Sequence, residues 1–131
     1  MNTVIIPLKA HWSLSWIYTK EEWRRFEKWN ARRKGVVDFL GYFLFHRESR
    51  ETQSVELTGQ SVTIADKKKY FSGPVTELRR VEIYDKKGFN VMIITYEIVS
   101  KKQLNEITFP IPKGKLKEAI DAQEKLMVAR K

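Results

Sequence analysis

The sequence predicts a single α+β domain in which two amphipathic helices accompany a set of short antiparallel strands. Three observations predict this class. The chain has 131 residues, of which 42% are hydrophobic, and no cysteine, so one core can form without disulfide bonds. Helix start and stop signals surround residues 20–34, and a two-residue alternation begins near position 53. We therefore expect one domain over 1–131, with an N-terminal strand and helical region at 1–50 and strands plus a closing helix at 53–131.

The N-terminal region opens with an extended segment. Residues 3–12 mix β-branched side chains with a proline, which predicts an edge strand. Residues 12–16 alternate apolar and polar side chains and continue it with one buried face. The first residues carry no basic leader before a long apolar run, so we expect no signal peptide.

The clearest local signal predicts a helix over residues 20–34. Thr19 and Glu22 have the spacing of a capping box, and Tyr18 and Trp23 the spacing of a hydrophobic staple. Gly35 follows as the helix stop. Helical spacing predicts an inner stripe of Trp23, Phe26, Trp29 and Asn30, with Arg24, Arg25, Lys28 and Arg32 mostly outside it.

Residues 36–46 fit either a buried strand or a short second helix, because helical spacing of the apolar residues competes with Gly41 and with aromatic content. Crossing a bilayer takes roughly 20 apolar residues, so the apolar run at 36–45 is too short to span. Residues 47–52 are polar and predict a connector.

The second half predicts hairpins. Residues 55–57 and 62–64 alternate around a turn at 58–60, and 66–69 read as a charged loop. A further turn is expected at 72–74. Two strands follow around a turn at 85–88, the first with Leu78, Val81 and Ile83 and the second with Val91, Ile93, Thr95 and Glu97.

The chain is predicted to end in one more strand and a closing helix. Residues 106–111 place Ile107, Phe109 and Ile111 on one face, and Pro110 and Pro112 indicate an edge strand or its exit. A helix follows over 115–129, with an apolar stripe of Leu116, Ala119, Ile120 and Met127.

This order of hairpins and closing helix resembles bacterial pleckstrin-homology-like (PH-like) domains, in which a bent antiparallel sheet or barrel is plugged by a C-terminal helix. The resemblance rests on Val55–Leu57 with Val62–Ile64, on Leu78–Tyr84, on Val91–Ile98 and on Ile107–Pro112. The front end, Tyr18–Trp23, resembles the entry to such domains in small bacterial membrane-associated proteins. Unlike lipid-binding eukaryotic members, the chain has an uncharged first hairpin turn and no tryptophan in its last helix. The resemblance therefore does not imply phosphoinositide recognition.

Catalytic patterns are missing from the sequence. His11 and His46 have no second ligand at metal spacing, and the pair Glu21 and Glu22 is explained by the helix start. The chain has neither a phosphate-binding glycine loop nor a nucleophile elbow. We expect no cofactor and no enzyme activity; an enzyme with a site of scattered residues is the lowest-ranked alternative.

The net charge of +9 is the compositional anomaly, and it indicates either a polyanionic partner or a surface charged for solubility. Two clusters are the candidate anion- or partner-binding residues: Arg24, Arg25, Lys28, Arg32, Arg33 and Lys34 on the first helix, and Lys67, Lys68 and Lys69. The interleaved Trp23, Phe26 and Trp29 could stack on bases, enter a lipid interface or simply anchor the helix in the core.

These observations favour a non-catalytic PH-like module that docks a protein partner or an anionic membrane surface. Nucleic-acid binding through the same basic residues is the competing hypothesis. A cytoplasmic location, with peripheral attachment to a membrane, follows from the expected lack of leader and span, and the sequence leaves the oligomeric state open.

Overall fold

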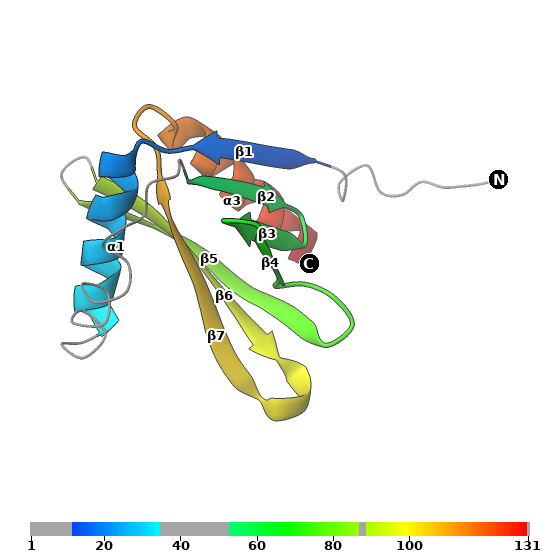
Figure 1. Cartoon of the computed structure of the whole chain (residues 1–131). Coiled ribbons are helices and arrows are strands. Elements are labelled where there is room, and N and C mark those ends of the chain that lie inside the picture. Colours follow the sequence, from blue (N-terminus) through cyan, green and yellow to red (C-terminus); the bar gives the residue numbers. More distant parts are fainter. Residues whose placement is uncertain (1–11, 35–52, 87–88, 131) are drawn as a thin grey trace.

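The computed structural model describes residues 12–34, 53–86 and 89–130. Within these ranges the chain forms two antiparallel sheets and two α-helices, so the α+β class is confirmed. Residues 3–11 of the strand expected at 3–12, the segments 36–46 and 47–52, and residues 87–88 of the turn expected at 85–88 lie outside the described residues. Figure 1 shows the strands of the two sheets running in different directions, with a helix to one side and another behind them.

The first sheet has the order β1-β2-β3-β4. Its strands are β1 (Ser13–Ile17), β2 (Ser54–Thr58), β3 (Ser61–Ile64) and β4 (Lys67–Tyr70). The predicted hairpin at 55–64 is present, and the Thr58 hydroxyl accepts the backbone N–H groups of Gln60 and Ser61 in its turn. Strand β1 pairs with β2 through Trp16 and Val55, which makes the N-terminal segment part of the same sheet as the hairpins.

The charged loop predicted at residues 66–69 is wrong, because Lys67–Tyr70 is strand β4, paired with β3. The turn needs only Ala65 and Asp66, whose φ angles are 50° and 68°. Two consecutive residues with positive φ match the twist of a tight hairpin. The lysine run hid this strand, since lysine is depleted in strands and the run shows no apolar alternation.

The second sheet has the order β5-β6-β7, with β5 (Thr76–Lys86), β6 (Phe89–Ile98) and β7 (Gln103–Ile111). The last strand begins three residues before the predicted start at 106, after a 3-10 turn at Val99–Lys101. Strand β6 is predicted from Val91, Ile93, Thr95 and Glu97, and the structure also buries Met92 and Ile94, as fully as Val91. Neighbouring residues of a strand point to opposite faces, so both faces of β6 are covered by apolar side chains of the core.

The two helices are α1 (Lys20–Lys34) and α3 (Leu116–Arg130). The capping-box bonds form in both directions, from Thr19 N–H to Glu22 Oε1 at 2.9 Å and from Glu22 N–H to Thr19 Oγ1 at 3.0 Å. Helix α1 packs on β7, and α3 packs on β5.

The predicted inward position of Ile120 on α3 is wrong, since its side chain is 42% exposed. The buried stripe of α3 consists of Ala119, Ala122 and Leu126, and Ile120 lies about 100° away from Ala119 around the helix.

A single hydrophobic cluster joins both sheets and both helices. Its largest fully buried side chains are Trp16, Tyr18, Phe71, Phe109, Leu57, Met92, Ile94 and Leu126. Helix α1 enters it through Trp23 and Phe26. The body of the domain therefore holds α1 in a fixed orientation and leaves its opposite face to solvent.

Candidate binding surface

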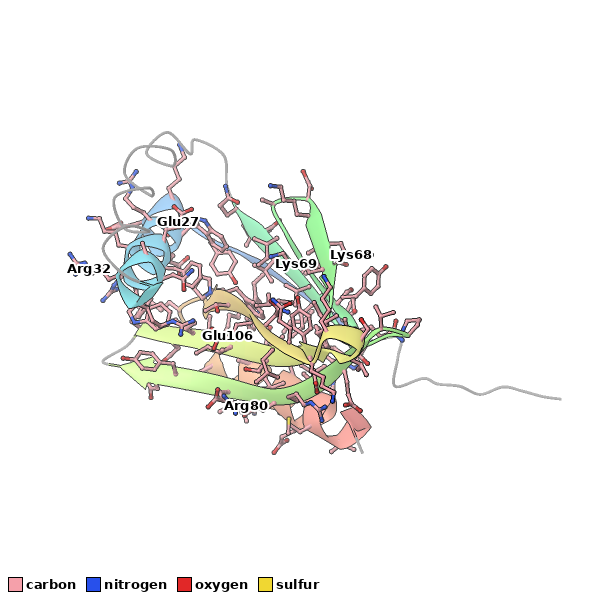
Figure 2. The ribbon with its side chains drawn as sticks, turned by 90° about the horizontal axis from the view of Figure 1, so that it is seen from below. Glu27, Arg32, Lys68, Lys69, Arg80 and Glu106 are labelled. Atoms are coloured by element: carbon pink, nitrogen blue, oxygen red, sulfur yellow. The ribbon has the colours of Figure 1, made fainter. Side chains whose placement is uncertain are left out.

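The solvent-facing side of α1 carries a ridge of cations. Lys20, Arg24, Lys28 and Arg32 follow one another at four-residue spacing and all are exposed, as is Arg25 beside them. Residues four apart lie on one face of a helix, so these five side chains form a continuous surface, which we call the α1 basic face. Glu21 is the acidic side chain that shares it. Figure 2 shows Arg32 projecting from α1 away from the sheets.

The aromatic residues that alternate with these cations point into the protein. Trp23 is 8% exposed and Phe26 4%, and the ring of Trp23 lies against Tyr18 at a centroid distance of 5.1 Å. Trp29 is partly buried and packs on Tyr84 and Phe89 of the second sheet. Buried rings cannot serve as a stacking platform for bases, so the aromatics of α1 are anchors.

Arg33 lies on the other side of the helix and has a structural role. Its guanidinium bonds Glu106 at 2.7 Å and Thr108 Oγ1 at 3.5 Å, both on β7, and it lies 5.3 Å from the centre of the Trp29 ring. These contacts fasten α1 to the edge of the second sheet. Lys34, the other basic residue predicted at this end, is the last residue of α1.

The second predicted cluster is separate from the first. Lys67, Lys68 and Lys69 are exposed on β4, an outer strand of the first sheet. Figure 2 shows Lys68 and Lys69 across the molecule from Arg32, and Figure 1 likewise separates β4 from α1. Lysine on an outer strand discourages pairing with other chains, which accounts for this cluster without a ligand.

A hollow of about 490 Å³ adjoins the α1 basic face. Arg25 belongs to both, and its guanidinium lies 5.4 Å from the centre of the Phe89 ring. The other lining residues are Glu22, Asn90, Pro110, Ile111, Lys113 and Gly114. Asn90 Oδ1 is buried and has no hydrogen-bond partner among the described residues. Neither Asn90 nor Lys113 carries a sequence signal for this position; the pairing of Asn90 with Ile111 brings the two strand ends together.

Glu22 connects the hollow to the helix start. Its Oε2 accepts the backbone N–H of Lys113 at 3.1 Å, in addition to the capping bonds with Thr19. Burial acts to raise the pKa of Glu22, but the N–H groups of Thr19 and Lys113 and the charge of Lys113 outweigh it, so the pKa is lowered. Glu22 is therefore a carboxylate at neutral pH, and the hollow contains one acidic and two basic side chains.

A second hollow, of about 410 Å³, lies between the segment before β5 and the end of α3, where Thr76 Oγ1 is buried without a partner among the described residues. Its lining includes Gly73, Pro74, Leu78, Val99 and Leu126. It contains no basic side chain and lies apart from both predicted clusters.

His11 and His46 lie outside the described residues, which contain no group of three or more histidine or acidic side chains placed to hold a metal ion. In the same part of the chain, no helix is long and apolar enough to cross a membrane. Comparisons with protein-family models, curated proteins and solved structures returned no match.

Proposed function

We propose that this chain is a non-catalytic, PH-like binding module that docks on an anionic membrane surface through the α1 basic face. The observation that carries the proposal is the exposed ridge of Lys20, Arg24, Lys28 and Arg32 on a helix whose opposite side is fixed in the core. A rigid row of cations along about 20 Å of helix suits an extended charged plane. For this function the protein would be attached to the cytoplasmic face of a membrane.

The expected strength follows from the charges. A basic residue close to an anionic bilayer contributes about 1 kcal/mol. Lys20, Arg24, Arg25 and Lys28, reduced by Glu21, therefore supply roughly 3 kcal/mol, which corresponds to a gain in partitioning of about a hundredfold. Such binding is weak and reversible, and salt screens it because the charges are exposed.

The PH-like assignment is supported by the arrangement of the elements. Among the described residues, seven antiparallel strands in two sheets precede one C-terminal helix, and Ala119, Ala122 and Leu126 of that helix are buried in the core. This agrees with the order of elements that the sequence resemblance implies. The core between the sheets is filled by apolar side chains, which favours a function carried out on the exterior.

The competing function is nucleic-acid binding, because the same cations would attract phosphates. The burial of Trp23 and Phe26 counts against it, since single-stranded nucleic acids are usually held by exposed aromatic rings. A protein partner with an acidic surface is the remaining alternative.

Vesicle co-sedimentation tests the proposal. The protein is mixed with phosphatidylcholine vesicles that contain or lack phosphatidylglycerol, at low salt and at about 0.15 M salt. The test variant replaces Lys20, Arg24 and Lys28 with glutamine, and the matched control replaces Lys67, Lys68 and Lys69, an equal loss of charge. Circular dichroism and sedimentation without vesicles check folding and self-association. We expect binding only to anionic vesicles and a loss of about a hundredfold in the α1 variant.

Three results would contradict the proposal. Equal losses in the two variants would mean that net charge, rather than the α1 basic face, governs binding. Failure to bind anionic vesicles at low salt would refute membrane docking. Binding to DNA or RNA with a roughly thousandfold loss between 50 and 200 mM salt, without vesicle binding, would establish the competing function.

A further inference from the structure

The hollow beside α1 is suited to an anionic group. Its lining contains the cations Arg25 and Lys113 and the carboxylate Glu22, which gives a net positive charge. Both Glu22 oxygens already accept backbone N–H groups, whereas Arg25 and Lys113 side chains are donors without acceptor capacity. The volume of about 490 Å³ lies within the usual range for small-ligand sites.

One residue that lines the hollow also carries an unused acceptor. Asn90 Oδ1 is buried and has no partner among the described residues, and an acceptor left in that state is unfavourable. A ligand in the hollow would reach this oxygen only after rotation about the last side-chain bond. A ligand that supplies an O–H or N–H donor would remove the cost.

The remaining walls restrict the shape of the ligand. Phe89, Pro110 and Ile111 provide apolar surface. Gly114 has a φ of 84°, and no atom lies within 4 Å of the place where a side chain would begin. The hollow therefore offers cations, one acceptor and apolar walls, which match a short carbon chain that carries both an anion and a donor.

We propose that this hollow binds the headgroup of a phosphodiester lipid whose alcohol retains free hydroxyl groups, such as phosphatidylglycerol. The phosphate lies between Arg25 and Lys113, and a headgroup hydroxyl donates to Asn90 Oδ1. This inference rests on the proposed membrane docking, because Arg25 joins the hollow to the α1 basic face. It adds a preference for one headgroup among lipids of equal charge.

Phosphatidylmethanol is the discriminating probe, because it has the phosphodiester charge of phosphatidylglycerol without a headgroup hydroxyl. Partitioning onto phosphatidylcholine vesicles that contain either lipid at the same mole fraction is compared. A hydrogen bond contributes about 0.5–1.5 kcal/mol, so we expect a preference of roughly 2- to 10-fold for phosphatidylglycerol. Asn90→Ala should bind both lipids about equally while retaining most of the affinity for phosphatidylmethanol.

Two further variants separate the roles of the hollow. Lys113→Gln keeps the backbone N–H that bonds Glu22 and removes the ammonium, so it should weaken binding to both lipids by a similar factor. Thr76→Val removes the unpartnered hydroxyl in the second hollow and should leave the preference unchanged. Amide NMR spectra of the variants report whether the fold is retained.

The outcomes distinguish this inference from the function on which it rests. Equal binding of both lipids by the unaltered protein overturns the headgroup inference and leaves membrane docking intact. Absence of binding to both overturns the docking itself. Soluble glycerol 3-phosphate, titrated without vesicles, tests the other source of the same chemistry: saturable shifts of the Asn90 amide with no lipid preference would assign the hollow to a soluble phosphate and refute the lipid assignment.

Discussion

The Tyr18 hydroxyl connects the start of α1 to the last strand, and its removal gives a quantitative test of the fold. Tyr18 is 1% exposed, and its hydroxyl donates to the Pro110 carbonyl oxygen at 2.5 Å. Tyr18→Phe keeps the ring but leaves a buried carbonyl without this donor. Such a loss costs about 1–3 kcal/mol, and a domain of this size should lose roughly 3–6 °C in Tm for each kcal/mol.

The cost of this substitution should shrink in alkali. Burial, and secondarily the Glu22 charge, raises the pKa of Tyr18 above the ordinary value of 10.0. A raised pKa in the folded state means that the stabilising contribution is complete below pH 10 and is lost as the pH rises, because the unfolded chain ionises first. Each pH unit above 10 removes about 1.4 kcal/mol from the unaltered protein, while phenylalanine loses nothing. The Tyr18→Phe penalty should therefore be about 1.4 kcal/mol smaller at pH 11 than at pH 8.

Urea unfolding at pH 8, 10 and 11 measures this difference directly. Other titrating groups are shared by both proteins, so they cancel in the comparison. Tyr70→Phe is the matched control: Tyr70 is 54% exposed, and its substitution should change stability by less than about 0.5 kcal/mol at each pH. A Tyr18→Phe penalty that stays constant from pH 8 to pH 11 would refute the buried, hydrogen-bonded hydroxyl.

Three further predictions concern the packing, the helix start and the outer strand. Leu126→Ala should cost about 2–5 kcal/mol by denaturant unfolding, whereas Val128→Ala on the exposed side of α3 should cost under about 0.5 kcal/mol; equal effects would contradict the orientation of α3. Glu22→Ala should lower the free energy of unfolding by about 1–2 kcal/mol at neutral pH. Because the pKa of Glu22 is lowered in the folded state, its stabilising contribution is complete above about pH 4.5 and is lost as the pH falls further. The stability of the variant should therefore approach that of the unaltered protein in acid. Replacing Lys68 and Lys69 with valine should produce concentration-dependent light scattering with an unchanged circular dichroism spectrum, and a variant that stays dispersed would refute the role assigned to these lysines.

Local patterns predicted much of the fold. The bonds between Thr19 and Glu22 join residues three apart, and the hairpin at 55–64 depends on a turn of its own residues, so neither needs information from elsewhere in the chain. The order of hairpins and closing helix, and with it the α+β class, follows from such patterns. Predictions failed where burial is set by distant residues. Strand β4 is held by its register with β3, and both faces of β6 are covered by side chains from the rest of the core.

The candidate site could be predicted only in part from the sequence, because it also depends on residues that are distant in the chain. The spacing of Arg24, Lys28 and Arg32 places them together on any helix, but it does not distinguish them from Arg33, which β7 engages through Glu106. The hollow depends on residues that the sheet register brings together. In the sequence, Asn90 is an ordinary polar residue. That its side-chain oxygen is buried without a partner depends on the tertiary structure.

Three of the four outer strands in the described part of the chain, β5, β7 and β4, favour binding through a helix face over addition of a partner strand to a sheet. On β5, the Val81 carbonyl oxygen already accepts the Gln123 side chain of α3 at 2.8 Å. Strand β7 is flanked by α1, and β4 exposes its lysines. An extended peptide would have to displace a helix or desolvate ammonium groups at these edges, which is costly. A polyanionic surface meets no such barrier at the α1 basic face, because those cations stay hydrated while they neutralise phosphates, and salt should therefore weaken that association far more than it weakens the fold.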